Sequence, residues 1–174
     1  MESRHKRIRL LVTRWALYTV ALLCAAALQT MPGFLTIGEC KPYFILAVCL
    51  AVAVCEDEFH GALFACVGGL LWDYTAGRTA GLLAIGLLML AFLVSVVVQL
   101  YLKPSWVNFL FLNLAAGFLI LSMDFLFFYL MRGYAYALQR YLLVVLPEAL
   151  LSAIVSPLAL MLVRRIQERF ALPE

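Results

Sequence analysis

The chain is divided into long apolar runs separated by short polar breaks, and this pattern restricts what it can fold into. Hydrophobic residues make up 66% of its 174 residues and charged residues only 13%. A soluble domain has about 45–50% apolar and about 25% charged residues, and one of this size has no interior for the excess apolar surface. The sequence therefore predicts an integral membrane protein with a single all-α transmembrane domain over residues 1–174.

Six apolar runs are candidates for membrane-spanning helices, because a helix needs about 20 mostly apolar residues to cross the hydrocarbon core. We expect helices at residues 15–35, 43–55, 59–75, 80–102, 106–131 and 141–163. The second and third runs are short, and the acidic turn Glu56-Asp57-Glu58 separates them. Joining them would place three acids near the bilayer centre, which is costly, so two short helices are favoured. A re-entrant hairpin, which leaves four full spans, is the alternative.

The distribution of basic residues predicts the orientation, because lysine and arginine accumulate in cytoplasmic loops. With six spans, nine of the 13 basic residues lie on the side of both termini and four lie on the other side. The first set is Arg4, Lys6, Arg7, Arg9, Arg14, Lys103, Arg164, Arg165 and Arg169, and the second is Lys41, Arg78, Arg132 and Arg140. We therefore expect both termini in the cytoplasm. The N-terminal basic segment also resembles a signal peptide, but the apolar run after it is too long for a signal core, so a retained first helix is favoured.

Three carboxylates within or beside the apolar runs are the most informative polar residues. Asp124 and Glu148 each lie about seven residues from the outer end of their runs, and Asp73 closes the third run. Lipid does not solvate a carboxylate, so these groups face the bundle interior or water. Asn113 shares the helical face of Asp124. A structural role, with the acids hydrogen-bonded or paired with an arginine of the outer loop, is favoured over a ligand, proton or catalytic site.

Signatures of enzymes and metal sites are absent from the sequence. It contains no nucleophile elbow, zinc-protease helix or phosphate loop, no C-x-x-C pair, and no histidine with a second ligand at metal spacing. Asp73 and Asp124 are candidates for an aspartic protease dyad, but Asp73 is flanked by Trp72 and Tyr74 rather than by polar residues. We therefore expect no catalytic residue, no metal, no cofactor and no nucleic-acid partner.

Several short motifs lie beside or within the apolar runs. A Lys-Pro pair precedes the second run, a Gly-Leu-Leu-x-Asp segment ends the third, a glycine turn leads into the fourth, and a proline lies in the last. The positions are Lys41, Pro42, Gly69, Asp73, Gly81 and Pro157. In these motifs the chain resembles the MreD family of rod shape-determining proteins. It differs from the family at Tyr43, where an acid is frequent, and at Ser152 or Ser156, where asparagine is frequent.

The resemblance implies a non-catalytic scaffold of the machinery that elongates rod-shaped bacteria and synthesises their peptidoglycan. The implied partners are the membrane, a bitopic MreC-like protein and, through it, the actin-like MreB and the RodA/transpeptidase complex. The implied location is the inner (cytoplasmic) membrane. The implied fold is similar to the substrate-binding S components of ECF vitamin transporters, so a small-molecule-binding S component is the alternative function. Candidate structural or partner-binding residues are Lys41, Pro42, Gly69, Asp73, Gly81, Asn113, Asp124, Glu148 and Pro157.

Overall fold

The structure is a computed structural model that describes residues 2–33, 35–36, 40–77, 81–101, 105–131 and 137–170. The elements within these ranges are all helical. They are α1 (Glu2–Thr30), α2 (Phe44–Cys55), α3 (Glu58–Thr75), α4 (Leu82–Tyr101), α5 (Trp106–Phe125), the π-helical turn η1 (Leu126–Leu130), α6 (Ala137–Arg140), the π-helical turn η2 (Tyr141–Val145) and α7 (Leu146–Arg169). The predicted all-α class is confirmed.

Four helical segments of the described chain are long and apolar enough to span a membrane. They are Arg7–Thr30, Leu82–Tyr101, Trp106–Tyr129 and Tyr141–Arg169. α2 has 12 residues and is therefore about 18 Å long, well short of the roughly 30 Å hydrocarbon core. α3 has 18 residues but carries an acid near each end, and it is not among the four. Four spans are supported, and the six-span arrangement stays a prediction about the α2–α3 pair.

The observed helices follow the predicted runs in the centre of the chain and differ from them at the ends. α1 has 29 residues and begins at Glu2 instead of residue 15, because its polar N-terminal segment continues the same helix. The run at 106–131 leaves α-helical geometry after Phe125 and continues as η1. The last run begins in η2, and α7 extends past residue 163 to Arg169. The polar extensions and the π turns are the features that hydropathy did not locate.

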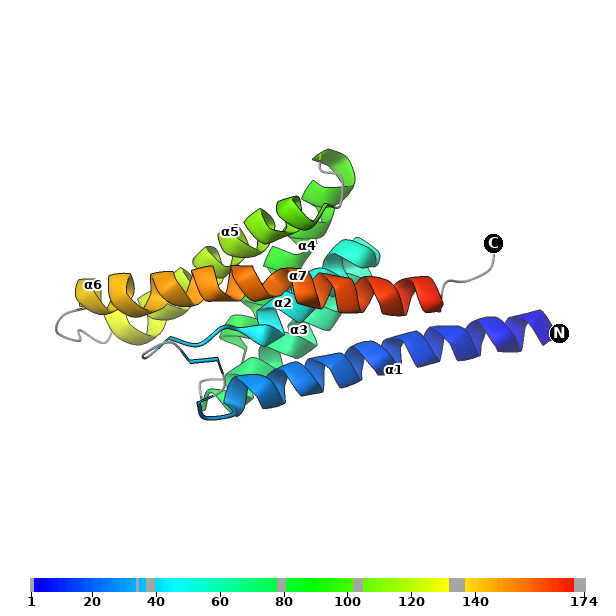
Figure 1. Ribbon diagram of the computed structural model, residues 1–174, viewed down its shortest axis with the longest axis horizontal. Coiled ribbons are helices and arrows are strands. Elements are labelled where there is room, and N and C mark those ends of the chain that lie inside the picture. Colours follow the sequence, from blue (N-terminus) through cyan, green and yellow to red (C-terminus); the bar gives the residue numbers. More distant parts are fainter. Residues whose placement is uncertain are drawn as a thin grey trace.

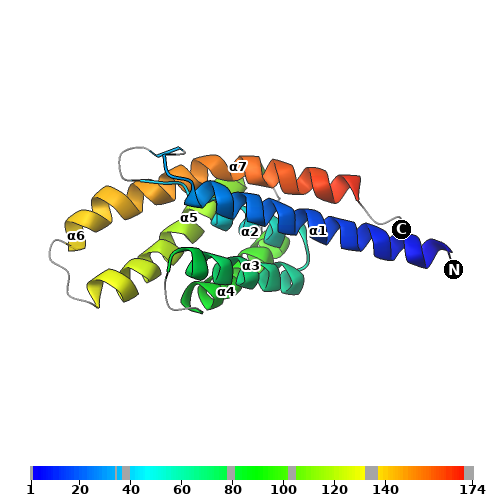
Figure 2. The same ribbon diagram turned by 90° about the horizontal axis from the view of Figure 1, so that it is seen from below.

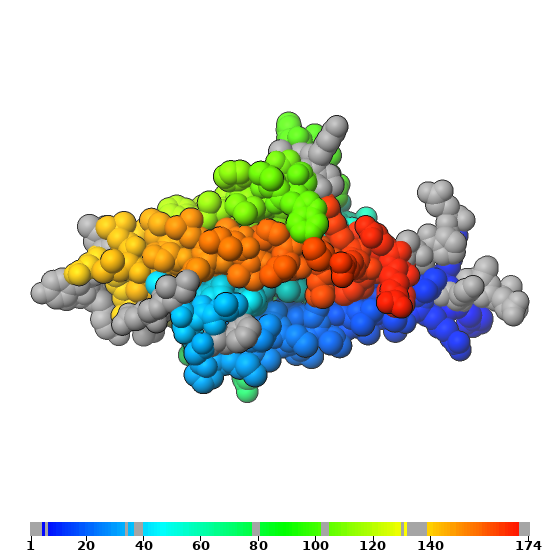
Figure 3. All heavy atoms as spheres, viewed as in Figure 1, coloured from blue at the N-terminus to red at the C-terminus, as the bar shows by residue number. Residues whose placement is uncertain are grey.

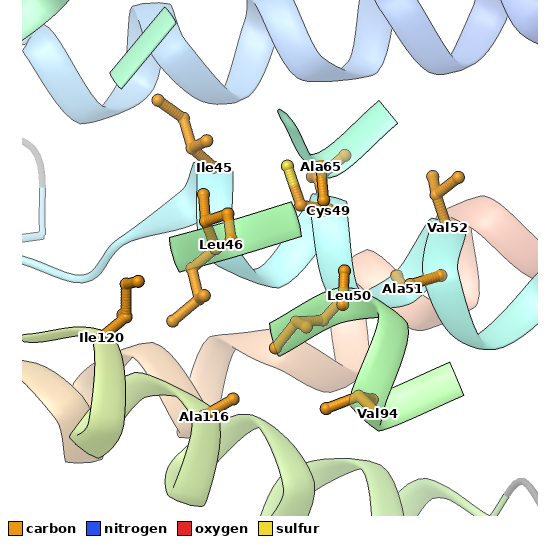
Figure 4. Close-up of a cluster of buried hydrophobic side chains, with 14 of the residues drawn as sticks. Ile45, Leu46, Cys49, Leu50, Ala51, Val52, Ala65, Val94, Ala116 and Ile120 are labelled. Carbon is orange, nitrogen blue, oxygen red and sulfur yellow. The ribbon is translucent and has the colours of Figure 1, made fainter. Parts of the chain in front are cut away.

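α2 lies at the centre of the bundle. The nine residues Ile45, Leu46, Ala47, Val48, Cys49, Leu50, Ala51, Val52 and Ala53 are all buried. The helix contacts α1, α3, α4, α5 and α7, and Figure 4 shows its side chains beside Ala65 of α3, Val94 of α4 and Ile120 of α5. A helix that is apolar on every side is stable only when other elements enclose it. α2 is therefore a core helix that the longer helices surround.

Small residues let α3 lie against both of its neighbours in sequence. A Cβ added at Gly69 would lie 2.5 Å from the Cα of Ala84 in α4, and one added at Gly61 would lie 2.6 Å from the Cα of Ala53 in α2. Membrane helices gain their packing energy through such close backbone approach. The α3–α4 pair has the most extensive interface of the described helices. Gly61 and Gly69 thus let α3 pack closely against α2 on one side and α4 on the other.

The two termini lie at the same end of the molecule, which we call the terminal end (Figure 1). α6 lies at the opposite end, which we call the loop end, as both views show (Figures 1 and 2). α1 and α7 contact each other and run side by side along the length of the molecule in opposite chain directions. Both termini therefore lie on one side of any membrane that these two helices cross.

Gly69→Ala should destabilise the protein, because the new Cβ would meet the backbone of Ala84 rather than a flexible side chain. Over-packing of this kind costs about 1–3 kcal/mol, which corresponds to a fall in Tm of about 5 °C for a chain of this size. Thermal denaturation of the purified protein in detergent measures it. Gly117→Ala is the matched control, because its Cβ would lie 3.4 Å from the end of the Leu46 side chain and 4.0 Å from Ala149, with no backbone atom closer than that. Equal Tm values for the two variants would contradict the prediction.

Candidate functional site

Polar side chains from three parts of the chain converge on a cavity at the loop end. The cavity has a volume of about 190 Å³. Asp124, in the last turn of α5, and Glu148, in the first turn of α7, both line it. Its lining consists of Tyr43, Leu121, Asp124, Phe125, Tyr129, Arg140, Val144, Val145 and Glu148. The prediction that Asp124 and Glu148 face the same internal space is confirmed.

The polar face of α5 is turned away from lipid, as its spacing predicts. Asp124 is 6% exposed and Asn113, three turns earlier, is fully buried. A carboxylate at membrane depth requires polar partners, and Arg140 brings a positive charge to the same cavity from α6. The other arginine expected near these acids, Arg132, lies outside the described residues. The arrangement fits the expected compensation of the acids by an arginine of the outer loop.

Tyr43 connects the start of α2 to α7. Its hydroxyl donates a hydrogen bond to Glu148 Oε2 at 3.0 Å, and its backbone N–H donates to Ser152 Oγ at 2.8 Å. Ser152 Oγ in turn donates to the carbonyl of Glu148 at 2.7 Å. The ring of Tyr43 packs on Trp72 of α3, with 4.6 Å between centroids. The phenol of Tyr43 thus supplies a hydrogen-bond donor to the Glu148 carboxylate.

Two π-helical turns, η1 and η2, border the cavity. Tyr129 of η1 stacks on Phe125 at 5.3 Å and lies 5.1 Å below the Arg140 guanidinium, a cation–π geometry. Tyr141 of η2 contacts Phe125 at 5.2 Å and shares a 2.7 Å hydrogen bond with Ser122 Oγ. Short π-helical segments inside α-helices frequently occur at functional sites. Sequence reasoning missed both turns, because a π turn leaves no mark in an apolar run.

A second cavity adjoins the first and shares Tyr43 and Glu148 with it. Its volume is about 330 Å³, and its lining consists of Gln29, Thr30, Lys41, Tyr43, Trp72, Thr75, Ala76 and Glu148. Lys41 Nζ lies 3.5 Å from the carbonyl of Met31, and Pro42 is buried behind it. Lys41 of the predicted Lys-Pro pair thus lines a cavity of the loop end.

Asp73 holds the connection between α3 and α4. The residue is fully buried, and its Oδ2 accepts a 2.8 Å hydrogen bond from the backbone N–H of Gly81. Gly81 has a φ of +115°, a conformation that glycine adopts without a Cβ clash. Asp73 Oδ1 has no hydrogen-bond partner among the described residues, and Arg78, the other candidate partner, lies outside them. Asp73 lines neither described cavity, so the geometry gives a dyad with Asp124 no support.

Pro157 and Asn113 occupy the interior of helices. Pro157 has no N–H and leaves the carbonyl of Ala153 without its helical donor, but Ser156 Oγ donates to that carbonyl at 2.7 Å. α7 therefore continues through the proline. Neither the oxygen nor the nitrogen of the Asn113 amide has a hydrogen-bond partner within the described part of the chain. Asn113 does not line the cavity of Asp124.

Sequence reasoning missed a buried ion pair on the terminal side of α2. Arg14 Nη2 lies 2.8 Å from Glu56 Oε2, and the two side chains are 13% and 8% exposed. The Tyr18 hydroxyl donates to the other oxygen of Glu56 at 2.8 Å. The predicted topology puts Arg14 and the acidic turn that contains Glu56 on the same side of the membrane. This shared location is the sequence signal from which the pair could have been predicted.

The described residues contain no group of three or more histidine, cysteine, aspartate or glutamate side chains arranged to hold a metal ion. The polar groups of the loop end are instead engaged with tyrosine, serine and backbone partners. This arrangement can bind or position a polar group, and it provides no set of metal ligands among these residues.

Four candidate spans, an enclosed core helix and inward-facing acids define a polytopic α-helical membrane protein. The family described as rod shape-determining protein MreD matches residues 10–167. The chain therefore belongs to the MreD family, and the resemblance seen in its short motifs is confirmed. Neither a curated protein nor a solved structure matches the chain significantly, so the similarity to ECF S components stays a prediction.

Asp73→Ala should destabilise the protein, because it leaves the N–H of the half-buried Gly81 without an acceptor. Hydrogen bonds to charged groups contribute about 1.5–3 kcal/mol, so the yield of folded protein and its Tm should fall. Asp73→Asn keeps an acceptor oxygen and should be close to the natural protein in both measurements. Size-exclusion profiles and thermal denaturation of the three proteins provide the comparison. Loss of cell-shape function in Asp73→Asn at a normal protein level would show that the charge itself is needed.

Proposed function

We propose that this chain is a non-catalytic scaffold of the bacterial cell-elongation machinery in the cytoplasmic membrane. Membership of the MreD family carries this proposal, since it makes the chain a rod shape-determining membrane protein. Its partner is an MreC-like protein with one transmembrane helix, and through that protein it joins the MreB filament and the RodA/transpeptidase complex. It synthesises no peptidoglycan itself and needs no cofactor.

The loop-end cavities are the part of the chain that we assign to the MreC-like partner. They combine carboxylates, an arginine and four aromatic rings at one end of the bundle, a composition able to hold a polypeptide segment where it leaves the membrane. Glu148 is half-buried and contributes to both cavities. A segment bound there would contact helices α5 and α7 together with the start of α2.

The distribution of basic residues gives the orientation of the protein in the membrane. We place the terminal end in the cytoplasm, because the basic residues concentrate there, and this puts the loop-end cavities on the outer face. A partner that acts on wall synthesis outside the membrane would then meet the chain on the side where the wall is made.

Glu148→Gln and Asp124→Asn should weaken capture of the MreC-like protein, because each removes a charge from the cavity that we assign to it. We expect about a tenfold loss, the size of one lost hydrogen bond to a charged group. The measurement is affinity capture from membranes of a rod-shaped bacterium whose own MreD family gene is replaced by each variant, together with cell shape. Cells should become rounded while the membrane level of the protein is unchanged. Asp57→Asn is the control, because that carboxylate is 85% exposed in the α2–α3 turn. Normal rods with full capture in the double variant would contradict the proposal.

Reporter fusions should give opposite compartments for Glu174 and for the segment between Arg132 and Arg140. A cytoplasmic reporter should be active after Glu174, and a periplasmic reporter should be active in the 132–140 segment. The nine-to-four distribution of basic residues motivates this result. The same compartment at both positions would contradict the topology without affecting family membership.

A further inference from the structure

An apolar groove runs between α1 and α7, with α2 as its floor. Its volume is about 490 Å³, and its lining consists of Leu17, Val20, Ala21, Cys24, Ala25, Leu28, Phe44, Ala47, Val48, Val155, Leu158, Ala159, Leu162 and Ile166. Figure 3 shows the two flanking helices, blue α1 and orange-red α7, side by side on one face of the molecule. All 14 lining residues are apolar, and both flanking helices are among the candidate spans. The groove therefore opens toward the membrane interior.

Positive charge lies at the terminal end of this groove. Arg169 follows Ile166 by three residues and Leu162 by seven, so it continues the same face of α7, and Arg165 borders that face. Both side chains are exposed, and neither has an ion-pair partner among the described residues. Across the groove, Arg14 lies one turn before Leu17, where Glu56 neutralises it. The acid nearest to them in α7, Glu168, follows Arg165 by three residues and neighbours it on the helix surface, but it lies off the face that continues the groove.

The dimensions of the groove distinguish between two kinds of apolar occupant, a partner helix and an extended hydrocarbon chain. Residues 17–28 of α1 and 155–166 of α7 each extend about 18 Å, which is a little more than half of the roughly 30 Å hydrocarbon thickness. A helix about 10 Å wide and 18 Å long occupies roughly 1,400 Å³, so a groove of about 490 Å³ would admit side chains of such a helix rather than the helix itself. An extended hydrocarbon chain is narrow and reaches about one leaflet deep, so it matches the groove in both respects.

We infer that the groove binds an anionic phospholipid from the leaflet at the terminal end. One acyl chain lies between α1 and α7 on the α2 floor, and the phosphate lies beside Arg165 and Arg169. Basic residues next to the ends of membrane helices attract anionic headgroups by about 1 kcal/mol each. A headgroup without net negative charge lacks this attraction. The two arginines therefore select for an anionic headgroup, and the apolar groove selects for an acyl chain. The bound lipid would then fix the spacing of α1 and α7 around the core helix.

Native mass spectrometry of the full-length protein in detergent tests the proposal. The probes are phosphatidylglycerol and phosphatidylethanolamine with identical acyl chains. Phosphatidylglycerol should bind on the order of tenfold more tightly. Arg165→Gln/Arg169→Gln should reduce that preference to less than about twofold. Lys41→Gln/Arg140→Gln changes the net charge equally at the loop end and should keep the preference.

Substitutions that place a large side chain in the groove test whether the acyl chain of the lipid lies there. Ala159→Phe should weaken phosphatidylglycerol binding about tenfold, and Leu158→Trp, at a more exposed position of the lining, serves the same purpose if the first variant does not fold. Ile154→Phe is the control, because this exposed residue of α7 lies outside the groove. Three outcomes would overturn the inference. The first is equal affinity for the two lipids, and the second is loss of the preference for phosphatidylglycerol in the Lys41→Gln/Arg140→Gln variant. The third is undiminished phosphatidylglycerol binding by both Ala159→Phe and Leu158→Trp. A photo-crosslinker at Leu162 that captures one protein of fixed mass in membranes would also overturn it, by showing that a partner helix covers the groove.

Discussion

The enclosure of α2 is the constraint on which the rest of the structure depends. This 12-residue helix is too short to cross a bilayer and is buried from Ile45 to Ala53, so it contributes stability only if other helices cover every side of it. Five helices do so. Cover on one side requires the glycines of α3, since a Cβ at Gly61 would collide with the α2 backbone. The bundle is thus arranged around an apolar core helix that is too short to reach both membrane surfaces.

Because α2 is buried, neighbouring helices must supply hydrogen-bond partners for the backbone groups at its two ends. The first N–H and last C=O groups of a helix have no partner inside it, and each one left unsatisfied in an apolar interior costs about 1–3 kcal/mol. At the start of α2, the Ile45 N–H donates to Gln29 Oε1 of α1 at 3.2 Å, and the N–H of Tyr43, the residue before the helix, donates to Ser152 Oγ of α7. At its end, Gln167 of α7 donates to the carbonyl of Cys55. Polar side chains of α1 and α7 therefore hold both ends of the core helix, which fixes where those two long helices lie.

Sequence reasoning reached the features that depend on periodicity and missed those that depend on packing. Apolar runs and charged breaks locate the helices, and the spacing of Asn113 and Asp124 correctly puts both on an inward face. The pairing of Arg14 with Glu56 was not predicted, because it depends on how α1 crosses the α2–α3 turn, and the residues are 42 apart. The π turns were missed because apolar residues allow either helical geometry, and contacts such as those of Tyr129 select one. The hydrogen bond from Tyr43 to Glu148 was missed because its two residues belong to separate runs.

The Arg14–Glu56 pair has a consequence for the order of events during synthesis. Glu56 is made 42 residues after Arg14, which at about 5–20 residues per second is a delay of roughly 2–8 s. Through that interval α1 has left the ribosome tunnel while Glu56, the carboxylate that pairs with Arg14 in the folded protein, has not yet emerged. The arginine side chain must stay in contact with water or lipid headgroups, so α1 is held near the surface until the acidic turn arrives. Gln167 comes later still, more than a hundred residues after Cys55, and the core helix is closed at both ends only when the last helix has been inserted.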